Sequence, residues 1–167
     1  MMRIQLKRGR DDASTLSCVR ADGSRTWAKV HPFFPRHDLT HYAVESVLGL
    51  REAFFGLVAS GWDLDAFARP GATRRLPPEA LFAEQVVGLL DRERALPEPM
   101  LAGAFNEALR ATQPDAVTHP AMPIDRPVLE RIRALRDGLI AQWNAVPPGE
   151  SLELVFPAPD VSLAAGG

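Results

Sequence analysis

The sequence His37-Asp38-Leu39-Thr40-His41-Tyr42-Ala43-Val44-Glu45 begins the segment that decides the fold of this chain, which continues to Ser60. Apolar residues recur through this segment at helical spacing, and the prolines of residues 32–35 end the strand before it. Gly61 is suited to the left-handed conformation that closes a helix, with Trp62 packing back on the last turn. The sequence therefore predicts one long helix from about His37 to Ser60.

On a helical wheel, this predicted helix is apolar over most of its circumference and carries one stripe of titratable groups. The stripe spans about 80° and contains His37, His41, Glu45, Leu48, Glu52 and Phe55, with Asp38 at its margin. A helix with this pattern is typically buried, and buried ionisable groups must be paired or bound to a metal. One alternative is a solvated face on which His41 pairs with Glu45. Another is a buried hydrogen-bond network with a purely structural role.

The two histidines of the stripe predict a metal site. His37 and His41 stand one turn apart on the same helix face, so both imidazoles can reach one divalent metal, with zinc as the default. We predict Glu45 as a further ligand or as a residue that orients a histidine. If the protein is an enzyme, metal-assisted hydrolysis is expected, with Glu45 or Asp38 as the catalytic group that takes a proton from water.

Helix geometry limits the ligands that this segment can supply. His37 and Glu45 lie about 12 Å apart along the axis at a rise of about 1.5 Å per residue, so they would strain to bind one ion together. A third ligand is therefore expected from elsewhere in the chain. The candidates are His31, Asp115, His119 and Glu130.

Two resemblances involve this helix. Residues 37–41 are similar to the His-Asp-x-x-His zinc motif of the coenzyme Q biosynthesis scaffold family, in which a glutamate follows. Glu52 is its counterpart here, one residue closer than in that family. This resemblance implies zinc binding by the two histidines. Residues 34–46, together with Gly61-Trp62-Asp63, also resemble a group of uncharacterised bacterial proteins, which brings no activity with it.

The remaining segments predict an α+β fold. Residues 3–7, 15–19 and 151–156 alternate between polar and apolar side chains, and Asp22-Gly23 predicts a tight turn in a hairpin over residues 15–30. Helices are predicted over residues 78–94 and 100–112, and after an Asp125 cap. We expect a small antiparallel sheet of the N-terminal strands and the C-terminal strand, packed against about four helices. One domain is predicted over residues 1–157, followed by a flexible tail at 158–167.

Composition limits the partners and the location. The formal net charge of −2 argues against an extended nucleic-acid footprint, and no segment has the length and apolarity of a membrane span or secretion signal. Cys18 is the only cysteine and is interpreted as a small buried apolar residue, which fits a reducing cytoplasm. The alternative function is a non-catalytic interaction module, with a homodimer formed through the helices after residue 77.

Overall fold

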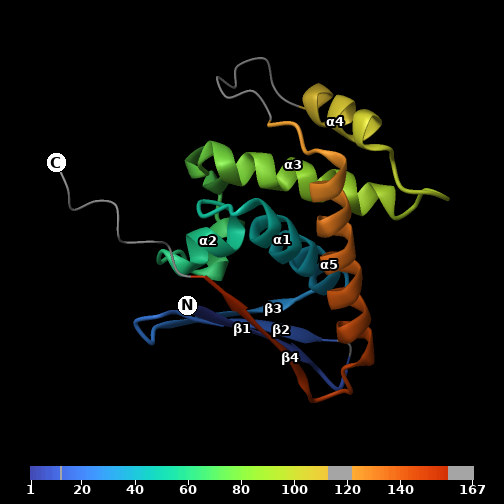
Figure 1. Ribbon diagram of the computed structural model, residues 1–167. Helices are drawn as coiled ribbons and strands as arrows, with labels where there is room; N and C mark the ends of the chain where they lie inside the picture. Colours follow the sequence, from blue (N-terminus) through green and yellow to red (C-terminus); the bar gives the residue numbers. More distant parts are fainter. Residues whose placement is uncertain (12, 113–121, 158–167) are drawn as a thin grey trace.

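The computed structural model describes residues 1–11, 13–112 and 122–157, and it contains an antiparallel sheet with helices on one of its faces (Figure 1). The predicted α+β class is confirmed. The strands are β1 (Met2–Arg8), β2 (Ser14–Val19), β3 (Arg25–Val30) and β4 (Ser151–Phe156), in the spatial order β3-β2-β1-β4. Gly23 adopts a positive φ of 85° in the turn between β2 and β3, as the predicted hairpin requires.

The C-terminal strand joins the antiparallel sheet, as the sequence predicts. It pairs with β1 in the register Met2↔Phe156, Ile4↔Leu154 and Leu6↔Leu152. Cross-strand partners point to the same side of a sheet, so these three residues of β4 share one core with their partners on β1.

Five α-helices and two short 3₁₀ helices follow or separate the strands in the described residues. They are α1 (Phe34–Leu48), α2 (Phe54–Ala59), η1 (Leu64–Ala68), η2 (Ala72–Arg75), α3 (Pro78–Glu93), α4 (Ala102–Ala111) and α5 (Arg126–Ala145). Helices α3, α4 and α5 confirm three predicted helices, and the predicted bounds agree with the observed ones to within two residues. The Asp125 side chain accepts a hydrogen bond from the backbone N–H of Val128 at 3.0 Å, which makes it the predicted cap of α5.

The single helix predicted from His37 to Ser60 is wrong, because the chain forms two helices there. Gly49 takes a left-handed conformation with φ of 69° and ends α1, a conformation that glycine adopts without steric cost. The helix also begins three residues earlier than predicted, at Phe34. Pro35 fits in that first turn, where its missing N–H is not needed by the helix.

The side chain of Glu79 fixes the segment that follows this break. The carboxylate of Glu79, from α3, accepts hydrogen bonds from the backbone N–H groups of Arg51 and Glu52, the latter at 2.6 Å. These bonds satisfy amides that a continuous helix would have bonded to its own carbonyls.

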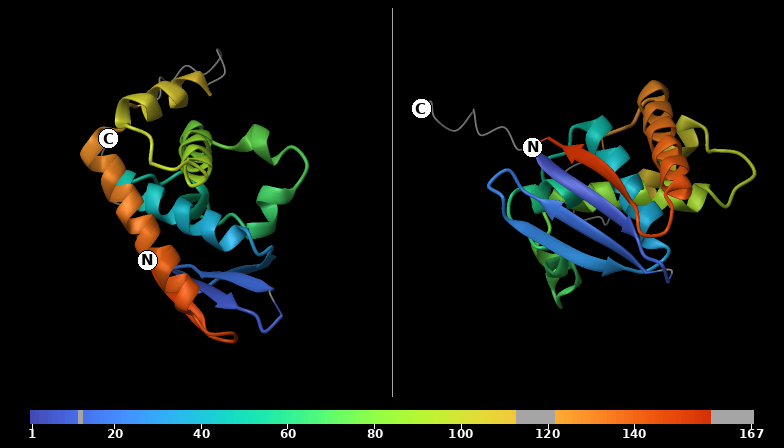
Figure 2. Two further views of the ribbon diagram at one scale, coloured as in Figure 1. Left: turned by 90° about the vertical axis from the view of Figure 1, so that its right-hand side faces the viewer. Right: turned by 90° about the horizontal axis from the view of Figure 1, so that it is seen from below.

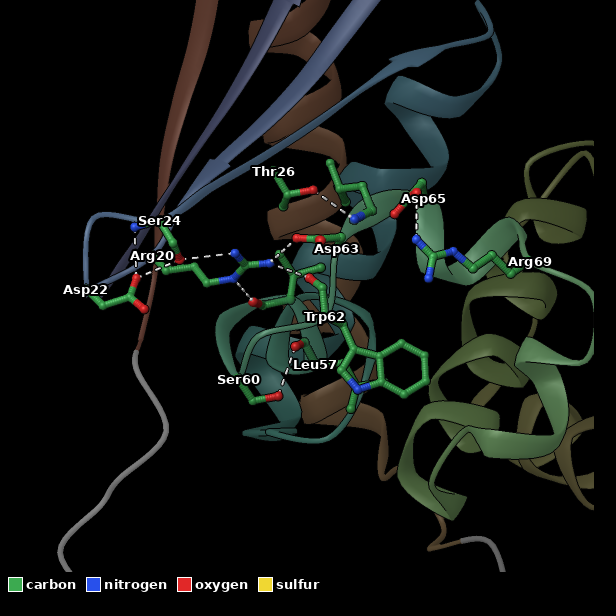
Figure 3. A network of polar contacts seen from close by, with 12 residues as sticks. Arg20, Asp22, Ser24, Thr26, Leu57, Ser60, Trp62, Asp63, Asp65 and Arg69 are labelled. Carbon is green, nitrogen blue, oxygen red and sulfur yellow. Dashed lines mark hydrogen bonds and ion pairs between the residues drawn. The ribbon is translucent and has the colours of Figure 1, made fainter.

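A buried arginine holds the C-terminal end of α2 (Figure 3). The guanidinium of Arg20, at the end of β2, donates to the carbonyl of Val58 at 2.7 Å and to that of Trp62 at 2.6 Å, and it pairs with Asp63 at 2.9 Å. A cation at this end also suits the helix dipole. The hairpin of β2 and β3 is thereby fixed to the last turn of α2.

Helix α1 lies between two apolar cores, with the sheet on one side and α3 on the other (Figure 1). Leu39 contributes to the core against the sheet, and Ala43 and Val44 contribute to the core shared with α3, α4 and α5. This position explains why α1 is apolar over most of its circumference. No helix in the described part of the chain has the length and apolarity needed to cross a membrane.

Candidate metal centre

The two predicted metal ligands converge at the contact between α1 and α3. The ring centroids of His37 and His41 lie 4.8 Å apart, as expected for side chains one turn apart on one face. On α3, Glu84 faces His41 and Asp91 faces His37. The two acids are seven residues apart and thus share a face of α3, and their order shows that the helices run antiparallel at this contact.

Three of these side chains form a group that is suited to one metal ion. His37, His41 and Glu84 each offer a ligand atom, and these atoms all lie within 4.8 Å of one another. Two bonds of about 2 Å to a common ion allow ligand atoms to be up to about 4 Å apart, so small side-chain rotations complete the convergence. His41 is buried, whereas the Glu84 side chain is 50% exposed, which leaves one side of the group open to solvent.

The Nδ1 atom of each histidine meets a carboxylate. The Nδ1 atom of His37 lies 2.7 Å from Oδ2 of Asp91, and the Nδ1 atom of His41 lies 3.3 Å from Oε1 of Glu45. Metal-binding histidines usually donate the N–H that is not used for the metal to a carboxylate, which fixes the tautomer and the ring orientation. Both rings therefore have the partner that would direct Nε2 toward an ion.

Glu45 uses both carboxylate oxygens within the protein. Its Oε1 contacts His41, and its Oε2 accepts hydrogen bonds from the backbone N–H groups of Phe55 at 2.9 Å and Gly56 at 3.3 Å. The residue is fully buried, and its carboxylate lies at the N-terminal end of α2, where the helix dipole favours negative charge. Three roles are predicted for Glu45: metal ligand, residue that orients a histidine, and catalytic acceptor of a proton. This arrangement supports the second.

The charges of the site shift the protonation of its members. Burial alone would lower the pKa of His41, but the hydrogen-bonded carboxylates of Glu45 and Glu84 outweigh it and raise that pKa to about 10. Burial opposes ionisation of Glu84, yet the hydrogen bond from His41 lowers its pKa below the usual value. Without a metal, His41 is therefore an imidazolium that donates to a carboxylate from each nitrogen.

Asp38, the other predicted catalytic acid, is not a member of the group of three. It is buried, and its Oδ2 atom has no hydrogen-bond partner among the described residues. Burial raises its pKa to about 7, against the lowering effect of the two histidines.

The third ligand in this group is a residue that the sequence did not indicate. Glu84 belongs to a predicted helix, but one acid on an exposed helix face is ordinary. The signal in the sequence was the spacing of seven residues between Glu84 and Asp91, which places both side chains on one face of a helix. Of the earlier candidates, His31 is exposed and Glu130 pairs with Arg126 at 2.8 Å on the surface of α5, whereas Asp115 and His119 lie outside the described residues, as does the predicted tail at 158–167.

Aromatic rings line the site. Phe54 lies 5.4 Å from the His41 ring, and Phe33 and Phe34 lie 6.2 and 6.0 Å from the His37 ring, measured between centroids. Their apolar surfaces lower the local dielectric, which strengthens the electrostatic contacts of the histidines.

Cys18 is excluded as a reactive group. It is fully buried in the sheet, and burial raises the pKa of its thiol to about 12, as expected for the predicted small apolar residue.

The chain matches no protein-family model, and no curated protein or solved structure is similar to it. The geometry of the site is therefore the basis for a proposal about function.

Proposed function

We propose that the protein binds a divalent metal ion through His37, His41 and Glu84, with zinc as the default ion. The observation that carries this proposal is the pairing of both Nδ1 atoms with carboxylates, from Asp91 and Glu45. A single ion pair on a helix surface does not require this arrangement. Two rings with their Nδ1 atoms fixed in the same way, beside a third ligand, are typical of a metal centre with its supporting shell.

The ligand set favours a metal that activates water. Three protein ligands with an open side are typical of catalytic zinc sites, whereas structural zinc is usually enclosed by four. A divalent ion supplies Lewis acidity, which makes water a nucleophile near neutral pH. Within the chain, Glu45 and Asp91 hold the imidazoles, and the half-exposed Glu84 leaves a path from solvent. We therefore propose metal-assisted hydrolysis as the reaction class. We also propose that the protein acts in the cytoplasm, because a single buried cysteine fits a reducing compartment.

Metal analysis tests this proposal directly. Protein purified without a histidine tag is analysed for bound zinc, iron, nickel and manganese, and zinc is then titrated against a competing chelator. Glu84→Gln should weaken zinc binding by more than the roughly 10–100-fold that is typical of losing a supporting residue. The control Glu107→Gln makes the same change at an exposed position of α4. Wild-type protein that binds none of these metals, or binds them equally well after Glu84→Gln, contradicts the proposal.

A second candidate function, a homodimeric interaction module, has support from exposed apolar residues. Three large side chains around the ends of the later helices are exposed: Leu96, Leu101 and Met122. Such residues are more frequent at interfaces than on isolated surfaces. Light scattering of wild type and Leu101→Asp decides this point, since a dimer that uses this surface should dissociate in the variant.

A further inference from the structure

The outer face of the sheet is uncovered by the described helices, all of which lie on the other side or beside it (Figure 2, right). This face contains an open hollow of about 620 Å³ that is lined by residues from all four strands. Ligand sites commonly have volumes of about 300–1,000 Å³. The hollow lies on the opposite side of the sheet from the proposed metal centre, and the inference below does not depend on that centre.

The pairing register arranges the outward side chains of this face in three rows across the sheet. The rows are Arg25, Val19, Arg3 and Val155; then Trp27, Ser17, Gln5 and Glu153; then Lys29, Thr15, Lys7 and Ser151. The middle row combines an indole with side chains that form hydrogen bonds. Each flanking row contains two basic residues, so cations lie on both sides of Trp27.

The face is positively charged in an acidic protein. Four of its side chains are basic and one is acidic, which gives a formal charge of +3 in a chain with a net charge of −2. The fold thus concentrates positive charge on one surface, where it can attract an anion although the whole protein cannot.

Protection of the sheet edge does not account for this surface. Lysine and arginine often block pairing at an edge strand, which explains Arg25 and Lys29 on β3. Arg3 and Lys7 lie on β1, which is paired on both sides. Trp27 is 65% exposed, and an uncovered indole makes a sheet edge more prone to association.

We propose that this face binds a short single-stranded nucleic acid, with one base stacked on Trp27 and neighbouring phosphates beside the basic rows. An exposed aromatic ring on a sheet, flanked by cations, has the chemistry that unpaired bases and their phosphates require. A duplex keeps its bases stacked and unavailable to the indole. The footprint is short because this surface offers one aromatic ring and because Glu153 interrupts the positive charge toward β4. The net negative charge of the protein argues against an extended nucleic-acid footprint, but it is compatible with a short local site of this kind.

Fluorescence anisotropy with a labelled oligonucleotide tests the proposal. The probes are single-stranded oligo-uridine and oligo-thymidine of about 10 nucleotides, with a duplex of the same length, at low salt. Trp27→Ala should weaken single-strand binding by about tenfold or more, and Trp27→Phe should restore most of it. The double variant Arg3→Gln/Lys7→Gln should weaken binding and flatten its salt dependence.

The matched control is Arg74→Gln/Arg75→Gln, which removes the same charge from exposed positions of η2 and should leave binding unchanged. Binding should also be the same with zinc or with a chelator, which separates this site from the metal centre. Three results would overturn the proposal: no binding by wild type, equal binding of duplex and single strand, or equal binding by wild type and Trp27→Ala. A dimer that Trp27→Ala dissociates, without nucleic-acid binding, would assign the face to a second copy of the chain.

Discussion

The carboxylate of Glu45 connects the ring of His41 to the first turn of α2. One oxygen lies 3.3 Å from Nδ1 of His41, and the other accepts the amides that begin the next helix. The same buried group therefore determines both the tautomer of a proposed metal ligand and the position of a structural element. Changes at this residue should affect metal binding and stability together.

Glu45→Gln should lower zinc affinity about 10–100-fold, because an amide can donate to Nδ1 and thereby place the ring proton on Nε2. It should also lower the free energy of unfolding by about 1–3 kcal/mol, since two backbone amides lose a charged acceptor. Chelator competition and urea denaturation measure the two effects. Glu52→Gln, an exposed residue after the Gly49 break, is the control and should change neither. Unchanged affinity in Glu45→Gln would assign it a structural role alone.

Asp91→Asn should weaken zinc binding about 10–100-fold with little effect on the melting temperature. The variant keeps the size of the side chain but removes the charge that lies 2.7 Å from Nδ1 of His37. Asp65→Asn makes the same change at an exposed position of η1 and should bind zinc like wild type. If the two variants have equal affinities, Asp91 does not orient His37 toward a metal.

Zinc binding should release at least one proton at pH 7. His41 has a pKa of about 10 without metal, so it is protonated at neutral pH, and a metal at Nε2 must replace that proton. Affinity should therefore rise with pH, by about tenfold per unit below this pKa. Calorimetry in two buffers with different ionisation enthalpies measures the proton count. Two results together would exclude His41 as a ligand: a zinc affinity that stays constant between pH 6 and pH 8, and a heat of binding that is about the same in both buffers.

Gly56→Ala should destabilise the protein by more than about 2 kcal/mol. A Cβ atom at this position would lie 2.1 Å from the carbonyl oxygen of Arg51, so the start of α2 must shift, and with it an amide that Glu45 binds. Gly88→Ala is the matched control, since no contact within 4 Å is found for its Cβ position in α3 among the residues that the structure describes. The free energy of unfolding of that variant should rise by about 0.5–1 kcal/mol, because alanine has a higher helix propensity than glycine. Equal melting temperatures for both variants would contradict the tight contact.

Removal of residues 150–167 should unfold the domain. The truncation deletes β4, which pairs with β1 along its length and contributes Leu152 and Phe156 to the core. A chain that ends at Pro157 retains β4 and serves as the control. Circular dichroism with thermal melting measures the outcome, and a cooperative transition at the wild-type temperature after the longer deletion would refute this role.

The sequence predicted the parts of the fold that local patterns determine. Alternation and the Asp22-Gly23 turn identified the strands, and proline and aspartate signals placed the later helices, because these signals act over a few residues. The break at Gly49 was missed for a non-local reason. A glycine inside a helix costs only about 1 kcal/mol, and here the carboxylates of Glu45 and Glu79 stabilise the interrupted chain through tertiary contacts.

The same reasoning applies to the candidate site. The convergence of His37 and His41 follows from their spacing along one helix, and the sequence was sufficient to predict it. Glu84 and Asp91 reach them only because α3 packs antiparallel to α1, which no local pattern encodes. Their identity as partners therefore required the packed structure.

Helix α2 has six residues, fewer than the roughly 12–15 at which an isolated helix becomes even marginally stable. Tertiary contacts stabilise it: Phe55 and Val58 are buried in the core, Glu45 binds two of its first amides, and Arg20 donates to the carbonyl of Val58 at its other end. We therefore expect α2 to form only after the hairpin and α1 have brought Glu45 and Arg20 together. In the native state, we expect hydrogen exchange of its amides to report a local opening reaction. Each opening would remove the backbone partners that hold the carboxylate of Glu45 beside His41.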